Sequence, residues 1–173
     1  MNTLEKIRIL VTFGALLAGQ ASAGTLGATS TDDSVITLEV GASVQISNVD
    51  DISLGAYGGT GVFSGSTEYC VHKSGASNYR VTLTTDTGSF KVSSITSGDN
   101  INFTAKIDGD ADASDGAVVT YNVATAAMTG SASTNCGGTD NGAIEVSFAQ
   151  ADLLAVSSAA DYTATMTILV EPI

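Results

Sequence analysis

Few side chains in this 173-residue sequence are of the types that perform catalysis or bind metals. His72 is the only histidine, and it stands two positions after Cys70 in a stretch without the G-x-S-x-G turn of serine hydrolases. A Cys-x-His spacing fits neither a zinc finger nor a redox pair. We therefore expect no enzymatic activity and no cofactor, and we interpret His72 as an edge or surface histidine.

The acidic stretch DGDADASDG is the other candidate for metal chemistry. Asp108, Asp110 and Asp112 place carboxylates at every second position, as calcium-binding loops do. Counting from Asp108, the sixth residue is alanine where an EF-hand needs glycine, and the twelfth is valine where it needs glutamate. We interpret the stretch as a solvated hairpin turn, with weak calcium binding as the alternative.

The first 23 residues have the pattern of a secretory signal. Lys6 and Arg8 precede an apolar stretch, residues 9–18, and a small-residue Ala-Ser-Ala cleavage site ends at Ala23. A membrane-spanning helix needs about 20 apolar residues, so this stretch is too short to cross a bilayer. We expect cleavage after Ala23 and an exported protein that is not embedded in the membrane.

Export determines how the two cysteines are interpreted. In an oxidising compartment a single cysteine pair favours a disulfide over a metal site. We therefore expect a bond between Cys70 and Cys136, with two unpaired thiols as the alternative. In the chain-entropy model a loop of this length is worth about 4 kcal/mol of stability.

Charge excludes one class of partner. The chain has 6 Lys and Arg against 18 Asp and Glu, a net charge of −12. Loss of the signal removes two of the basic residues and leaves Lys73, Arg80, Lys91 and Lys106. Nucleic-acid binding needs clustered Lys and Arg to neutralise phosphates. Nucleic acid is therefore excluded as a main partner.

Most of the chain has the alternating pattern of β-strands. One apolar and one polar face per strand is typical of antiparallel sheets, so we expect an all-β sandwich of two sheets. Residues 150–160 are the one helix-like stretch, expected to form a loose turn or an irregular crossover. The alternating stretches are residues 36–40, 44–46, 52–54, 79–83, 90–92, 101–107, 119–123, 144–148 and 162–170.

Both ends of the exported chain are informative. A polar leader, residues 24–33, precedes a short alternating strand, residues 34–40, and the chain closes on the longest alternation, residues 161–171. A strand that follows a polar leader at the start of the exported chain predicts that this strand completes the sandwich of a neighbouring molecule. The alternative is that it forms the first strand of its own sandwich. Its apolar face consists of Ile36, Leu38 and Val40.

Three stretches, in this order, resemble the archaic chaperone–usher pilins and the related spore coat protein U-like domains. VQISNVDDISLGAY (44–57) is similar to the family's first strand with its L-G-x-Y turn. YCVHKSGASNYRVTL (69–83) is similar to the Cys-bearing second strand and the strand after it, and DYTATMTILVEP (161–172) to the terminal strand. The family often has a cysteine in its first strand, whereas the second cysteine here is Cys136.

The resemblance implies an immunoglobulin-like sandwich that lacks its last strand and is completed by donor-strand exchange. In such families a periplasmic chaperone fills the open groove, and the N-terminal strand of the next subunit replaces it at an outer-membrane usher. The donor residues are then Ile36, Leu38 and Val40, in a donor segment of residues 34–43 before a domain of residues 44–173. One edge of the groove is expected at Tyr162, Ala164, Met166, Ile168 and Val170.

The predicted function is thus that of a pilin, the structural subunit of a cell-surface filament (fimbrium) that serves adhesion or biofilm formation. Its partners are copies of itself, with the chaperone and usher during assembly. The alternative is a self-contained secreted sandwich that binds a glycan or a protein. The absence of tryptophan weakens the glycan reading, because sugar-binding platforms rely on exposed aromatic rings.

Overall fold

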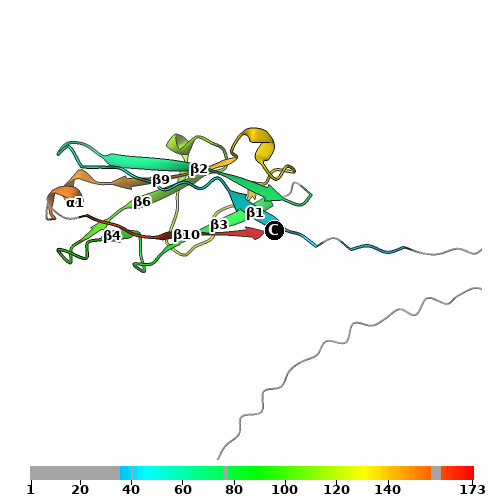
Figure 1. The fold of residues 1–173 in the computed structure, drawn as a ribbon, viewed down its shortest axis with the longest axis horizontal. Coiled ribbons are helices and arrows are strands. Elements are labelled where there is room, and N and C mark those ends of the chain that lie inside the picture. The colour runs from blue at the N-terminus through cyan, green and yellow to red at the C-terminus, as the bar shows by residue number, and fades with distance from the viewer. Residues whose placement is uncertain (1–35, 40, 76–77, 157–160) are drawn as a thin grey trace, which may run out of the picture. The chain divides into compact units, whose positions relative to one another are not determined.

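In the computed structural model, the described residues are 36–39, 41–75, 78–156 and 161–173. Residues 40–173 form one compact unit (Figure 1). Its strands are β1 (Val44–Ser47), β2 (Phe63–Lys73), β3 (Asn78–Thr85), β4 (Lys91–Ser93), β5 (Asn100–Asn102), β6 (Thr104–Asp108), β7 (Ala117–Val118), β8 (Met128–Thr129), β9 (Gly142–Phe148) and β10 (Met166–Pro172). Its helices are the short 3-10 turns η1 (Ala113–Asp115) and η2 (Cys136–Gly138) and the five-residue α1 (Gln150–Leu154).

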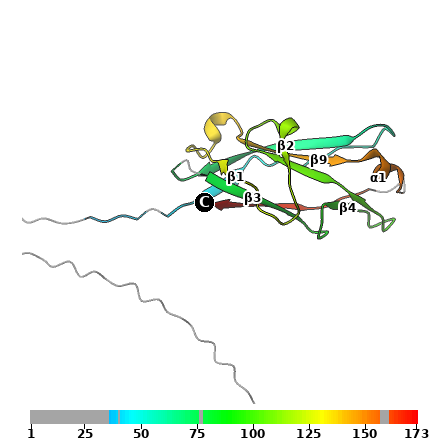
Figure 2. The same cartoon turned by 180° about the vertical axis from the view of Figure 1, so that it is seen from behind.

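These strands form an antiparallel sandwich, which confirms the predicted fold class. One layer is a five-stranded sheet in the order β1-β2-β9-β6-β7, and the other contains β10-β3-β8 (Figures 1 and 2). A separate two-stranded sheet pairs β4 with β5. Every pair of named strands is antiparallel. Among the described residues, no helix is long and apolar enough to span a membrane.

The core lies between the layers, where the alternation directs one face of each strand inward. Its central strands are β2, β3, β6 and β9. The larger buried cluster consists of Tyr69, Val71, Tyr79, Val81, Leu83, Ala105, Ile107 and Ile144. A smaller cluster of Ile101, Val146 and Phe148 fills the other end.

One lateral side of the sandwich is closed by the segment of residues 119–129. The N–H of Val119 donates to the carbonyl of Ala105 on β6 at 3.0 Å, and the N–H of Asn122 donates to the carbonyl of Leu83 on β3 at 2.9 Å. The segment then pairs with β3 as β8. Main-chain hydrogen bonds therefore join both layers on this side.

Several predicted strands differ from the observed ones. The predicted strand 101–107 divides at Phe103, whose N–H donates to the carbonyl of Phe90 at 2.9 Å, because the chain changes partner there from β4 to β9. Residues 119–123 form no strand, because they cross between the layers and turn at Asn122, where φ is 57°. The loose turn predicted for residues 150–160 corresponds to α1 in its described part.

Candidate functional site at the open side of the sandwich

The opposite lateral side is open, and β10 forms its edge. β10 is the end strand of its sheet and pairs only with β3. In the register of this pair Ile168 stands opposite Leu83 and Val170 opposite Val81. Leu83 and Val81 are 1 % and 0 % exposed, whereas their partners on β10 are only half-buried. The core is therefore incompletely covered along β10.

Of the predicted acceptor residues, Met166, Ile168 and Val170 lie on one face of β10, and Tyr162 and Ala164 directly precede this strand. All of them are half-buried, and the residues between them are exposed, including Leu169 at 51 %. The alternation thus directs one row of partly covered apolar side chains toward the core along the unpaired edge. The row consists of Tyr162, Ala164, Met166, Ile168 and Val170.

The main-chain groups of this edge alternate as well. The N–H of Ile173 donates to the carbonyl of Asn78 at 3.1 Å, and the N–H of Thr163 donates to the carbonyl of Ser93 at 3.0 Å, so odd-numbered residues face β3 and β4. In an antiparallel ladder the residues between them direct their N–H and C=O groups the other way. Those residues include Ala164, Met166, Ile168 and Val170. In the part of the chain that the structure describes, no strand meets them.

The facing wall of the open side comes from the N-terminal part of the unit. β1 is the edge strand of the other layer, and its inward side chains Val44 and Ile46 are half-buried. Ile52 and Leu54, which the sequence analysis placed on a strand, follow in an unpaired segment but also pack against the core. β1 approaches β10 without pairing with it. Half-buried apolar side chains therefore lie along both edge strands, β1 and β10.

A buried lysine ties the two layers at one end of the open side. Lys73, the last residue of β2, is 3 % exposed and stands opposite Val44 of β1. Its Nζ donates to the main-chain oxygen of Ile173 at 2.8 Å, just beyond β10. An ammonium is costly to bury unless it is hydrogen-bonded, so this contact fixes where the chain leaves β10. Sequence reasoning missed it, because the two residues are far apart in the chain.

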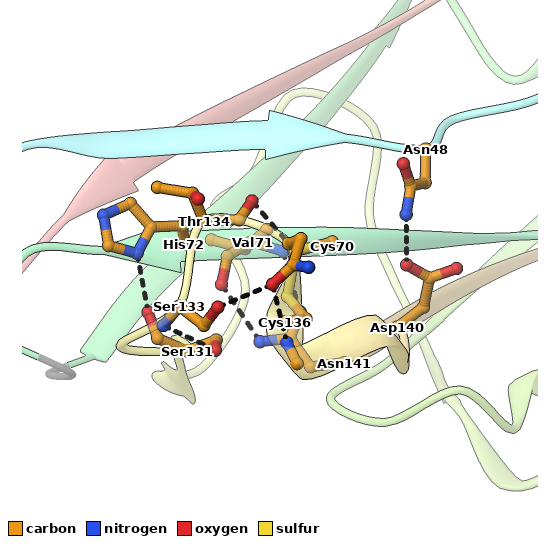
Figure 3. The surroundings of a disulfide bond; sticks show 12 residues. Asn48, Cys70, Val71, His72, Ser131, Ser133, Thr134, Cys136, Asp140 and Asn141 are labelled. Atoms are coloured by element: carbon orange, nitrogen blue, oxygen red, sulfur yellow. Dashed lines mark hydrogen bonds between the residues drawn. A yellow bond between two sulfur atoms is a disulfide. The ribbon is translucent and has the colours of Figure 1, made fainter.

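The predicted disulfide between Cys70 and Cys136 is present (Figure 3). It joins β2 to the loop that precedes β9. Where β9 no longer accompanies β2, Asn141 of this loop replaces a strand: its Oδ1 accepts from the N–H of Val71 at 2.7 Å, and its Nδ2 donates to the carbonyl of Val71 at 3.0 Å. The disulfide loop thereby supports the part of β2 on which β1 is paired.

His72 also stabilises this part of β2. Its Nδ1 donates to the carbonyl of Ser131 at 3.0 Å, and the ring is half-buried (Figure 3). An imidazole that donates to a main-chain carbonyl in this way fits a role in positioning the chain. His72 stands opposite Gln45 of β1 on one side and bridges to Ser131 on the other, so it lies inside the sheet and not at the predicted edge or surface.

The acidic loop differs in one residue from the predicted calcium ligands. Asp108, Asp110 and Asp115 have carboxylate oxygens within 4.8 Å of one another. Asp112 is not in this group, because its carboxylate caps η1 by accepting from the N–H of Ser114 at 2.9 Å. Hydrogen bonds from the side chain and from the N–H of Ser114 lower the pKa of Asp112. Asp115 belongs to the same acidic stretch but lies outside the every-second-residue spacing, and it joins the cluster because the short helix η1 turns it back toward Asp108.

The predicted donor segment is described in part. Ile36 and Leu38 are 92 % and 83 % exposed, and residues 36–39 form no strand. Val40, the third predicted donor residue, lies outside the described residues.

The open side offers main-chain donors and acceptors beside apolar side chains. These are the features with which sheet edges bind an added strand. Comparison of the sequence with protein-family models gives no match, and comparison with curated proteins gives no match either.

Proposed function

We propose that this protein is a pilin: a structural subunit of an extracellular filament that polymerises by donor-strand exchange and serves adhesion or biofilm formation. The observation that carries the proposal is the contrast between β3, whose inward side chains are buried, and β10, whose inward side chains are only half-buried beside an unpaired edge. A strand added to β10 would cover them. The disulfide fits a chain that is exported to an oxidising compartment.

The N-terminal segment of a second copy is the proposed occupant. Ile36, Leu38 and Val40 are spaced by two, so a strand would direct all three side chains to one face. Complete burial of three such side chains is worth roughly 5 to 9 kcal/mol. The hydrogen bonds to β10 add to this gain, and the entropy lost on association offsets part of it. The balance favours slow dissociation.

The unpaired edge of β10 is also the basis for proposing partners that assist assembly. An unpaired strand edge beside exposed apolar side chains is prone to aggregation, so a subunit in transit needs a cover. We assign this role to a periplasmic chaperone that binds β10 until an outer-membrane usher exchanges it for the next subunit. The chaperone would use the same main-chain groups of β10 as the donor does.

Substitution in the donor segment tests the proposal. Leu38→Asp would bring an unpaired charge into an apolar environment at a cost of several kcal/mol. We expect folded subunits that remain with the chaperone, whereas the wild type forms detergent-resistant ladders in unboiled gels and filaments in electron micrographs. Glu39→Gln, on the opposite face, is the matched control and should assemble normally.

Two results would contradict the proposal. Normal filaments from the Leu38→Asp variant, or an experimental monomer structure in which residues 34–40 pair within their own sandwich, would overturn the proposal. A self-contained secreted binding module would then be the better account.

A further inference from the structure

We propose that the closed lateral side of the sandwich carries a binding site for a small aliphatic amine, that is, a positively charged ammonium group on an apolar chain. The site is a groove beside β7, lined by residues of β6, β7 and the segment of residues 119–129. This side lies away from β10 and does not involve the donor segment. The proposal therefore goes beyond filament assembly and does not depend on it.

The groove has the size and the lining of a small-molecule site. Its volume is about 470 Å³, and sites for small molecules typically measure about 300 to 1,000 Å³. Two of its valines, Val118 of β7 and Val123 of the crossing segment, are 66 % and 53 % exposed. An aliphatic chain in the groove would remove part of this apolar surface from water, which favours binding.

Met128 joins the apolar lining to the acidic loop. A β-carbon on Gly109 would lie 3.5 Å from the Cγ of Met128, so this side chain packs directly against the main chain of the loop. Methionine is flexible and polarizable, and it adapts to ligands of different shape. The apolar surface of the groove therefore continues up to the carboxylates that follow β6.

Carboxylates give one end of the groove its negative charge. Asp108 and Asp115 line the groove, and their oxygens lie within 4.8 Å of one another and of Asp110. In the described part of the chain, none of these three residues forms an ion pair. Lys106 of β6 pairs with Glu145 instead, at 3.5 Å. A cation at this end would offset the mutual repulsion of the carboxylates.

The two features together select the class of ligand. An anion would be repelled by the carboxylates and by the net charge of −12. An uncharged apolar molecule would make no use of the carboxylates, and a bare metal ion would make no use of the valines. An ammonium group on an aliphatic chain uses both. Since the groove is much larger than one amino-acid side chain, its occupant is a free amine and not a lysine of another protein.

Titration of the exported protein with octylammonium tests the proposal. The methyl signals of Val118, Val123 and Met128, followed by NMR, should shift and saturate. Octanol and octanesulfonate have the same chain with a neutral and an anionic head, and octanol should bind about threefold to fivefold more weakly, the size of an exposed ion pair. Octanesulfonate should bind more weakly still. Shortening the chain to butylammonium should also weaken binding, by up to about fourfold for each CH₂ that the groove buries.

Two pairs of variants locate the site. Asp115→Asn removes one charge from the groove and should weaken octylammonium binding by about threefold. Asp152→Asn makes the same change in net charge on α1, outside the groove, and should leave the dissociation constant unchanged. Val118→Thr keeps the β-branched shape but makes the lining polar, and should weaken binding by about threefold. Val62→Thr, 72 % exposed outside the groove, is its control.

Several outcomes would overturn the proposal. Equal affinities for octylammonium and octanol would show that the carboxylates play no part, and equal effects of Asp115→Asn and Asp152→Asn would show that only net charge matters. Tighter binding of a capped lysine than of butylammonium, which has the same four-carbon chain, would favour a protein partner over a free amine. The ligand series uses the unaltered chain, so it decides the outcome whatever the stability of the variants. All four variants should still form filaments, so failure of this proposal leaves the proposed function untouched.

Discussion

Ile168 of β10 stands opposite Leu83 of β3, and only Leu83 is fully buried. Both are large aliphatic residues that point into the same sandwich from neighbouring strands. Leu83 has β10 on one side and the segment of residues 119–129 on the other, where the N–H of Asn122 donates to its carbonyl. Ile168 has a strand on one side only. Sheet topology, and not residue type, therefore creates the open side.

Hydrogen exchange should reveal the alternation along β10. The amides of Met166, Ile168 and Val170 face the open edge and should exchange rapidly in the free subunit, whereas those of Thr167 and Leu169 face β3 and should be protected. Polymerisation should protect the first set and leave the second unchanged. Residue-resolved exchange by NMR or mass spectrometry measures this. Equal protection of both sets in the free subunit would show that the edge is already covered.

Adjacent residues on β10 provide a matched pair of substitutions. Ile168→Ala removes a side chain that the donor would bury, so we expect the polymer to lose about 2 to 4 kcal/mol and the free subunit less. Leu169→Ala removes an exposed side chain on the opposite face and should change both by under 0.5 kcal/mol, about the size of ordinary surface effects. Guanidinium-induced dissociation and subunit unfolding report the two quantities. Equal losses in the polymer from both variants would contradict the proposed acceptor face.

Gly142→Ala should destabilise the subunit. A β-carbon at this position would overlap the ring of Tyr69, its partner across β2 and β9, and the ring is fully buried and cannot move aside. Overpacking of this kind costs about 1 to 3 kcal/mol, measured as a shift of the denaturant midpoint. Gly58→Ala, where a β-carbon meets nothing within 4 Å and φ is ordinary, is the control. Equal midpoints in both variants would show that the Tyr69 ring can relax.

Reduction of the disulfide should affect the free subunit more than the polymer. The bond between Cys70 and Cys136 restrains the unfolded chain by about 4 kcal/mol in the chain-entropy model. It also holds the loop whose Asn141 supports β2. A completed sandwich seldom visits the unfolded state, so assembled subunits should resist dithiothreitol. Thermal unfolding of both forms with and without reductant is the test, and similar losses in both would contradict the expectation.

Stability should decline at alkaline pH because of the buried tyrosines. Burial is the main cause that raises the pKa of Tyr69, and the neighbouring Tyr79 adds to it; burial also raises the pKa of Tyr79. In the unfolded chain tyrosine has a pKa of about 10. The folded state therefore holds these protons more tightly, and the resulting stability is complete below pH 10 and is lost as the pH rises toward the folded pKa.

Denaturant titrations between pH 8 and 12 measure this decline. Tyr69→Phe should reduce the pH dependence above pH 10, because it removes one of the two groups with a raised pKa. An unchanged slope would show that other groups dominate alkaline unfolding.

The amino-acid sequence by itself determined the local features of this protein. Alternation over residues 162–170 identified which side chains of the last strand face inward, because successive residues of a strand point to opposite faces wherever the strand lies. The cysteine pair followed from an inferred secretory signal and the chemistry of an oxidising compartment. Glycine and acidic residues located the turns, including the loop that begins at Asp108.

Only the tertiary structure decided which edges stay open. Whether β10 has one neighbour or two depends on pairings between residues far apart in the chain, and no local pattern encodes them. The same reason explains the contact of Lys73 with Ile173 and the exchange of Asp112 for Asp115 in the acidic cluster. Phe103 likewise reads as the middle of one strand, but the change of partner from β4 to β9 divides it into two. Long-range pairing thus determined the candidate site, whereas local alternation determined the side chains that line it.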